Sequence, residues 1–132
     1  MTPARILIAD DDASIRRLLK MTLRYRGYQV IEARNGREAL TEMRGGNPDL
    51  VLLDLMMPEV SGWDVLRERS GDPSLQRIPI IVITATNERN VTVGLLNAPF
   101  DAVIAKPFDL DALVAIVSAC LKRVHPAAPA AA

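Results

Sequence analysis

Short apolar runs alternate along this chain with segments in which apolar residues recur at helical spacing. The runs predict five buried strands, at 6–9, 29–33, 50–54, 80–84 and 103–106. Apolar stripes bounded by glycine, proline or turn residues predict five helices, at 15–23, 37–44, 62–69, 87–96 and 110–121. In the first helix, the residues expected to face the core are Ile15, Leu18, Leu19, Thr22 and Leu23.

This alternation of strand and helix predicts an α/β domain with a parallel sheet covered by helices on both faces. Right-handed crossovers leave few arrangements for five βα units, so we expect a flavodoxin-like (βα)5 fold. This is a doubly wound parallel sheet with strand order 2-1-3-4-5, in which the first and third strands are neighbours. We expect one domain over 1–124, and a disordered Pro- and Ala-rich tail or the start of a linker at 125–132.

Composition narrows the range of functions. The 132 residues fit one domain, and 16 basic side chains balance 16 acidic ones. We therefore expect no direct binding to nucleic acid and no association with anionic membranes. No apolar run approaches the about 20 residues of a membrane span, and a single cysteine, Cys120, fits a reducing compartment. A cytoplasmic protein is the expectation.

Four of the predicted strands end in polar residues. These residues are Asp10, Asp11, Asp12, Asp54, Thr84 and Lys106. Ligands of open parallel sheets bind at the carboxyl ends of the strands, so these groups are expected to meet there. Each has a structural explanation when taken alone. One of the first three aspartates, most readily Asp12, would cap a helix, and Asp54 would belong to a turn. Thr84 would be an ordinary strand residue, and Lys106 a solvated charge. Together they indicate a site.

The chemistry of this set suits a phosphoryl group and a divalent cation. Neighbouring carboxylates repel one another unless a cation binds, and Mg²⁺ prefers oxygen ligands. An aspartate such as Asp54 is a known covalent phosphoryl acceptor. The hydroxyl of Thr84 and the ammonium of Lys106 could both contact the phosphoryl oxygens.

Taken with its neighbours, this pattern resembles the receiver domains of two-component response regulators, including the chemotaxis regulators. The resemblance covers residues 5 to about 121. The matching segments, in order, are Ile8-Ala9-Asp10-Asp11 with Ile15-Arg16, Leu53-Asp54-Leu55-Met56-Met57-Pro58 with Ser61-Gly62, Ile83-Thr84-Ala85, and Lys106-Pro107-Phe108.

The resemblance implies a role for each of these residues. It implies that a histidine kinase or histidine phosphotransfer protein phosphorylates Asp54, and that the phosphorylated domain binds a downstream protein. Thr84 and Lys106 would contact the phosphoryl group. Mg²⁺ would be held by Asp10, Asp11, Asp54 and the main-chain carbonyl of Met56. Such a domain is a phosphorylated signalling switch and not a multiple-turnover enzyme.

The chain departs from the family pattern near its last strand. Val103 stands three residues before Lys106, where receivers often have an aromatic residue that moves on activation. Pro99 stands where glycine is common. Whether this chain uses the aromatic part of the switch is therefore an open question.

Two other functions fit parts of the sequence. A degenerate receiver would serve only as a passive protein-binding module. A phosphohydrolase of the haloacid dehalogenase type would use the Asp-x-Asp-x-Ser pattern that begins at Asp10, but it needs a later Gly-Asp-x-x-x-Asp element and a cap, which are not found.

If the chain is a receiver, Met56 and Thr86 are poorly suited to orient a hydrolytic water, which predicts a slowly decaying phosphorylated form.

Overall fold

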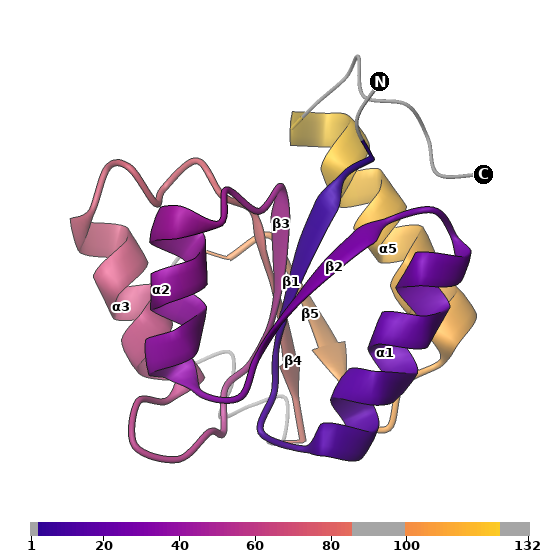
Figure 1. Cartoon of the computed structure of the whole chain (residues 1–132), viewed down its shortest axis with the longest axis horizontal. Helices are drawn as coiled ribbons and strands as arrows, with labels where there is room; N and C mark the ends of the chain where they lie inside the picture. The colour runs from indigo at the N-terminus through magenta and orange to yellow at the C-terminus, as the bar shows by residue number, and fades with distance from the viewer. Residues whose placement is uncertain (1–2, 86–99, 125–132) are drawn as a thin grey trace.

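The computed structural model describes residues 3–85 and 100–124. The predicted helix at 87–96, Thr86 and Pro99 lie outside the described residues. The elements are β1 (Arg5–Ala9), α1 (Ala13–Tyr25), β2 (Gln29–Ala33), α2 (Gly36–Gly45), β3 (Leu50–Asp54), α3 (Gly62–Gly71), β4 (Ile80–Thr84), β5 (Ala102–Ala105) and α5 (Leu110–Val124). Their order in the chain and their orientation are shown in Figure 1.

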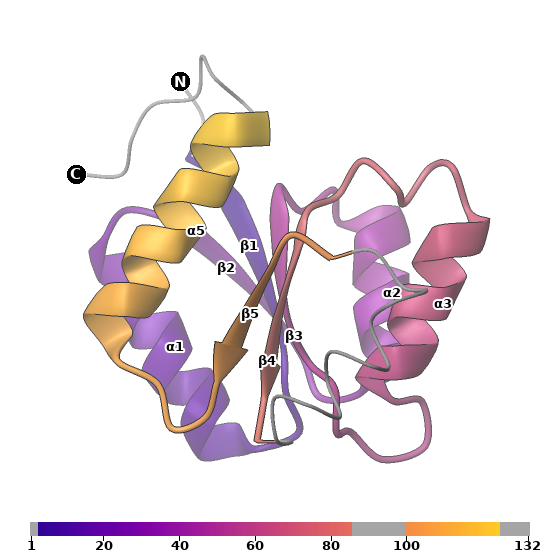
Figure 2. The same cartoon turned by 180° about the vertical axis from the view of Figure 1, so that it is seen from behind.

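The sheet is parallel throughout, and its strand order is β2-β1-β3-β4-β5. This confirms the predicted flavodoxin-like order. Helices α1 and α5 cover one face of the sheet and α2 and α3 cover the other, as the two opposite views show (Figures 1 and 2). Because β1 and β3 are neighbours, with Ala9 opposite Leu53, the residues that follow these strands emerge side by side.

Two apolar layers, one on each face of the sheet, form the core. Alternate residues of each strand enter opposite layers: Leu7 and Leu53 pack on the α2–α3 side, and Ile8 and Leu52 on the α1–α5 side. All five residues of β3 and all five of β4 are buried. These two neighbouring strands therefore form a closely packed support for the groups at their ends.

Helices α1, α2 and α3 begin at side-chain caps that the sequence carries. Asp12, which was expected to be the cap among the three aspartates, accepts hydrogen bonds from the amides of Ser14 and Ile15. Asn35 caps α2 and Ser61 caps α3, each accepting from an amide three residues on. These caps fix where each helix starts relative to the preceding strand.

One detail of the helix prediction is wrong. Leu18 was expected to face the core, but 45% of it is exposed. Helix α1 contacts the sheet through Leu19 and Leu23, which are fully buried, with Ile15 half-buried beside them. The contact follows i, i+4 spacing, so residues one position away turn to solvent.

Candidate functional site

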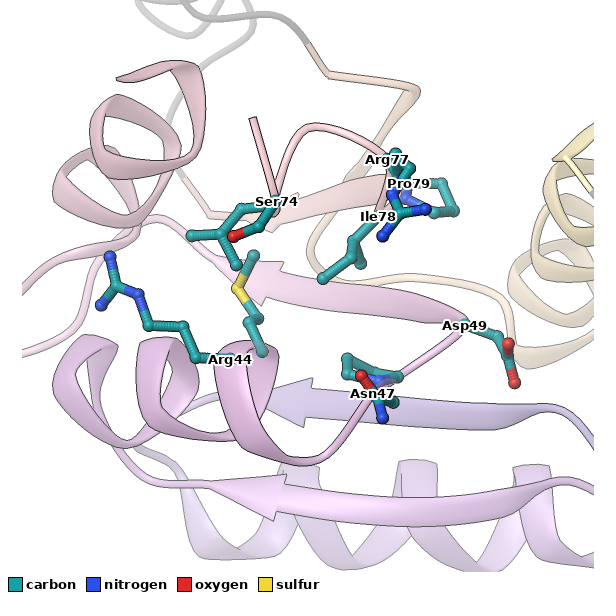
Figure 3. A pocket seen from close by; sticks show the side chains of 10 residues that line it. Arg44, Asn47, Asp49, Ser74, Arg77, Ile78 and Pro79 are labelled. Atoms are coloured by element: carbon teal, nitrogen blue, oxygen red, sulfur yellow. The ribbon is translucent and has the colours of Figure 1, made fainter. Parts of the chain in front are cut away.

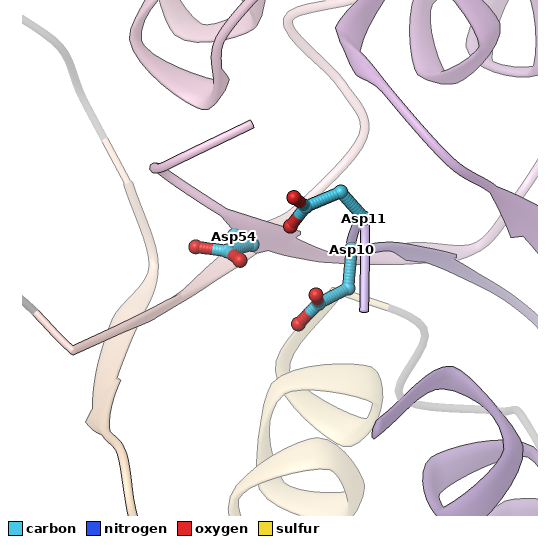
Figure 4. A group of neighbouring side chains, drawn as sticks. All are labelled: Asp10, Asp11 and Asp54. Atoms are coloured by element: carbon cyan, nitrogen blue, oxygen red, sulfur yellow. The ribbon is translucent and has the colours of Figure 1, made fainter. Parts of the chain in front are cut away.

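Two carboxylates are buried where β1 and β3 end. Asp10 is 2% exposed and Asp54 is 4% exposed, whereas the adjacent Asp11 is exposed. One carboxylate oxygen from each of the three lies within 4.8 Å of the others. Figure 4 shows the three side chains converging at the ends of their strands. The structure thus brings together the three aspartates that the sequence predicted to be neighbours.

Lys106 bridges the two buried carboxylates. Its Nζ lies 2.9 Å from Asp10 Oδ2 and 3.1 Å from Asp54 Oδ2, and 16% of its side chain is exposed. The main chain holds it in place, since the Lys106 amide donates to the Thr84 carbonyl at 2.9 Å. The strand β5 ends at Ala105, one residue earlier than predicted, and the following Lys106–Pro107 peptide bond is cis.

The environment shifts the ionisation of these groups. Burial raises the pKa of Asp54, and the charge of Asp10 raises it further, against the opposing hydrogen bonds from the Met56 amide and Lys106. For Lys106, burial acts to lower the pKa, but the hydrogen bonds and charges of Asp10 and Asp54 outweigh it and the pKa is raised. Lys106 is therefore a charged ammonium among carboxylates that it only partly neutralises.

The donor set suits a hard divalent cation. The oxygen ligands are close together, two of them are anchored in buried positions, and the exposed Asp11 leaves one side open to water. Mg²⁺ keeps several waters and binds such sites through a few carboxylates. The Met56 amide donates to Asp54 Oδ1 at 3.0 Å, which folds the chain back beside the carboxylate. A role for the Met56 carbonyl stays a prediction.

Thr84 lies at the same edge of the sheet as the aspartates. It is the last residue of β4, it is 1% exposed, and its neighbour Ile83 pairs with Asp54. The predicted placement at the end of the strand is confirmed. Contact of its hydroxyl with a phosphoryl group stays a prediction.

Sequence reasoning gave no individual role to Arg16, which supports the acidic loop. Its Nη1 donates to the Asp10 carbonyl at 2.8 Å, and its Nε lies 3.4 Å from Glu32 Oε1 on β2. The sequence signal for this role was the position of Arg16, four residues after the helix cap Asp12. The contact itself depends on the pairing of β1 with β2, which helical periodicity does not reveal.

One groove among the described residues lies away from this site. It has a volume of about 620 Å³ and lies between the end of α2 and the segment before β4, at the opposite edge of the sheet. Figure 3 shows Arg44, Asn47 and Arg77 around it. The candidate site is instead a compact cluster of charged groups, which fits a small ion and a phosphoryl group better than a large ligand.

Together, the fold and the cluster define a class of protein: flavodoxin-like α/β domains with an acidic, lysine-bridged site at the carboxyl edge of the sheet. Comparison with protein families makes the assignment specific. The model of the response regulator receiver domain matches residues 6–118, so the chain belongs to that family. The predicted relationship is confirmed, and the domain is a receiver of two-component signal transduction.

Curated relatives agree with the family. The response regulator MprA of Mycolicibacterium vanbaalenii is 40% identical over 126 residues, which cover 94% of this chain and 53% of that protein. MprA of Mycobacterium tuberculosis is 38% identical over 122 residues, covering 92% of this chain and 52% of that protein. The chain thus spans about half the length of the curated relatives it matches.

Solved structures show the same fold. A CheY-like receiver domain protein from Methanospirillum hungatei JF-1 superposes with a TM-score of 0.86 at 28% identity, covering 96% of this chain and 99% of that one. A putative response regulator from Chloroflexus aurantiacus J-10-fl gives 0.85 at 30% identity, covering 92% and 99%.

Membership of the family carries some general properties. Receiver domains are typically non-enzymatic signalling domains that bind Mg²⁺ at an acidic pocket and interact with histidine kinases and downstream targets. Within 3–85 and 100–124, no helix is both long and apolar enough to cross a membrane. In this chain, Asp10, Asp11 and Asp54 form an acidic cluster whose oxygens could hold a metal ion.

Proposed function

We propose that this domain is a phosphorylation-controlled switch in which Asp54 is the phosphoryl acceptor. A carboxylate oxygen of Asp54 attacks the phosphorus of a phosphohistidine on a histidine kinase or phosphotransfer protein. The new bond is the aspartyl O–P bond, the P–N bond breaks, and its electron pair stays on the imidazole nitrogen. The acyl phosphate then changes the affinity of the domain for a downstream protein.

The observation that carries this proposal is the arrangement around Asp54. It is buried at the end of a central strand, next to Asp10 and Asp11, and Lys106 holds it at 3.1 Å. A buried pair of carboxylates is unfavourable unless cations oppose it. A receiver with this intact cluster is better suited to accept a phosphoryl group than to act as a passive binding module.

The neighbouring residues have separate roles in this proposal. Asp10, Asp11, Asp54 and the Met56 carbonyl would hold Mg²⁺, which supplies neutralisation of the charge on the phosphoryl oxygens when it is bound.

After transfer, the new phosphoryl charge gives the Lys106 ammonium a stronger partner than the two carboxylates it bridges. The Thr84 hydroxyl at the end of β4 would donate to a phosphoryl oxygen. The two contacts would draw the β4 and β5 ends towards Asp54, which gives the acyl phosphate a means of changing the surface of the domain.

The proposal also covers where the domain acts and what it binds. It acts in the cytoplasm as a stoichiometric acceptor, without multiple turnover, and it binds proteins and not nucleic acid directly. A relative from Porphyridium aerugineum, 39% identical, is described as a probable transcriptional regulator, and this chain covers 52% of it. That description is of the relative, and no transcriptional output is proposed for the residues of this chain.

Phosphoryl incorporation from acetyl phosphate tests the proposal. We expect wild-type protein to take up one phosphoryl group per chain in Mg²⁺ and none in EDTA, as measured by intact-protein mass spectrometry. Asp54→Asn should take up none. The matched control is Asp12→Asn, which keeps a capping side chain beside the cluster and should label fully.

Undiminished incorporation in Asp54→Asn would show that another residue is the acceptor. If folded wild-type protein takes up no phosphoryl group from acetyl phosphate or from a phosphorylated histidine kinase, the domain is a passive binding module.

A further inference from the structure

Helix α3 begins directly against the backbone that carries Asp54. The amide of Gly62, its first residue, donates to the Leu55 carbonyl at 3.0 Å. A Cβ atom placed on Gly62 would lie 2.3 Å from the Asp54 carbonyl oxygen and 2.6 Å from the Leu55 Cα. Real Cβ atoms essentially never approach other atoms closer than 3.0 Å. Only glycine fits this contact.

Neither side of the contact is free to move away. On the helix side, Ser61 and Asp64 form a reciprocal capping box, and the next turn is anchored by Val65 and Leu66, which are 0% and 1% exposed. On the strand side, Leu55 is 0% exposed. A side chain at this position would therefore strain the contact itself, which on the strand side is the Asp54–Leu55 peptide unit, between the Asp54 side chain and Met56.

We propose that Gly62 is a positioning residue for the phosphoryl-acceptor site. The missing side chain lets the start of α3 lie on the Asp54 carbonyl, and this contact fixes the Asp54 carboxylate and the turn through Met56 in one arrangement. The inference rests on the proposed function, because it assigns Gly62 the task of holding Mg²⁺ ligands that the function requires.

The expected effect is large because the overlap is large relative to the tolerance of such sites. Groups in a catalytic or metal site must be held within about 0.5 Å of their working positions, and a displacement of about 1 Å can lower a rate by about 100-fold. The gap between 2.3 Å and 3.0 Å exceeds that tolerance. We expect Gly62→Ala to weaken Mg²⁺ binding and to slow phosphoryl transfer, each by about tenfold or more.

The chain supplies a matched control on the same helix. Gly71 is the last residue of α3, and a Cβ placed there meets nothing within 4 Å. Gly71→Ala makes the same chemical change without the contact on β3. Isothermal titration calorimetry with MgCl₂ and the rate of labelling by acetyl phosphate should give wild-type values for Gly71→Ala and reduced values for Gly62→Ala.

A second control separates positioning from general loss of stability. A Cβ on Gly36 would lie 2.4 Å from the Val60 carbonyl, an equally severe contact at the far end of the loop after β3. Gly36→Ala should lower the free energy of unfolding, measured with urea in EDTA, but keep Mg²⁺ affinity within about twofold of wild type. Equal losses of affinity in Gly36→Ala and Gly62→Ala would show a merely structural role and overturn the proposal.

Wild-type protein provides the measurement if Gly62→Ala does not fold. Mg²⁺ should slow hydrogen exchange of the Gly62 amide, because bound metal fixes the backbone to which it donates, and should leave Gly71 unchanged. Exchange at Gly62 that is insensitive to Mg²⁺ overturns the proposal, as does a folded Gly62→Ala that binds Mg²⁺ like wild type. Absence of Mg²⁺ binding in wild-type protein would instead overturn the proposed function itself.

Discussion

At both edges of the sheet, positively charged side chains contact carboxylates, but the proportions of the two are opposite. At the carboxyl edge, the single ammonium of Lys106 meets a cluster of three aspartates. At the amino edge, the single carboxylate of Asp101 meets two guanidinium groups, from Arg69 at 3.7 Å and Arg123 at 4.0 Å. Among the described residues, negative charge is therefore in excess in the cluster at the carboxyl edge and not in the contacts of Asp101.

At the amino edge, the charged groups of Asp101 and Arg69 have hydrogen-bond partners within the protein. Asp101 Oδ2 accepts from the Ile80 amide at 2.7 Å, and the Asp101 amide donates to the Ile80 carbonyl at 2.8 Å. Arg69, which is 8% exposed, donates to the carbonyls of Ile78 and Gln76. Burial lowers the pKa of Arg69 and the charge of Asp101 opposes that effect. These contacts join α3, β4 and the segment before β5.

The carboxyl edge lacks that balance. Asp10 and Asp54 are more deeply buried than Asp101, yet they share one ammonium, and the pKa of Asp54 is raised in consequence of burial and of Asp10. This difference separates charges that complete the fold from charges that, in the proposed function, receive a cation and a phosphoryl group from solution. The following predictions test this division, beginning with the largest effect.

Removal of the arginine at the amino edge should cost stability without affecting the chemistry. Arg69→Met leaves Asp101 without its buried partner and two carbonyls without a donor, so we expect the free energy of unfolding to fall by about 3 kcal/mol. Urea denaturation measures this loss. Mg²⁺ affinity and acetyl phosphate labelling of the folded variant should match wild type. A tenfold loss of either would show that the two edges are not independent.

Removal of the cation at the carboxyl edge should affect both stability and response. Lys106→Ala leaves the carboxylates of Asp10 and Asp54 unopposed, so we expect a loss of about 2 kcal/mol in EDTA. Mg²⁺ should recover more stability in this variant than in wild type. Once phosphorylated, the variant should lack the change in amide exchange that wild type shows. A wild-type change would mean that Lys106 does not couple phosphorylation to structure.

Substitution next to the acceptor should alter only the lifetime of the phosphorylated form. Met56 is 60% exposed, and its side chain offers no group to orient a hydrolytic water. We expect wild-type phosphoprotein to decay over minutes or longer, and Met56→Asn to decay about tenfold faster, equivalent to about 1.4 kcal/mol of barrier. Phosphoprotein decay followed by mass spectrometry in EDTA checks both rates. Equal rates would show that access at this position does not control hydrolysis.

The sequence predicted the sheet order and the cluster because both depend on local patterns. Apolar runs locate the strands, and the polar residue after each run must emerge at the carboxyl edge once the strands are parallel. The double contact of Lys106 with Asp10 and Asp54 could be expected only in outline, since it depends on side-chain reach across three strands.

Other features had no local signal. The Arg69–Asp101 pair joins residues that no motif connects, and the contact of Gly62 with the Asp54 backbone depends on how α3 docks on β3. The exposure of Leu18 likewise depends on the angle at which α1 packs. These properties arise from tertiary packing, which periodicity does not determine.

The stability of wild-type protein in Mg²⁺ tests the central claim most directly, namely that the carboxyl edge is built to receive a cation. Urea unfolding in MgCl₂ at 100 times the dissociation constant should show a gain of about 2.7 kcal/mol over EDTA at equal ionic strength. Asp11→Asn should gain much less, because the Asp11 carboxylate belongs to the cluster, and Asp12→Asn should gain as much as wild type. No gain in wild type, or an equal gain in Asp11→Asn, would contradict the account.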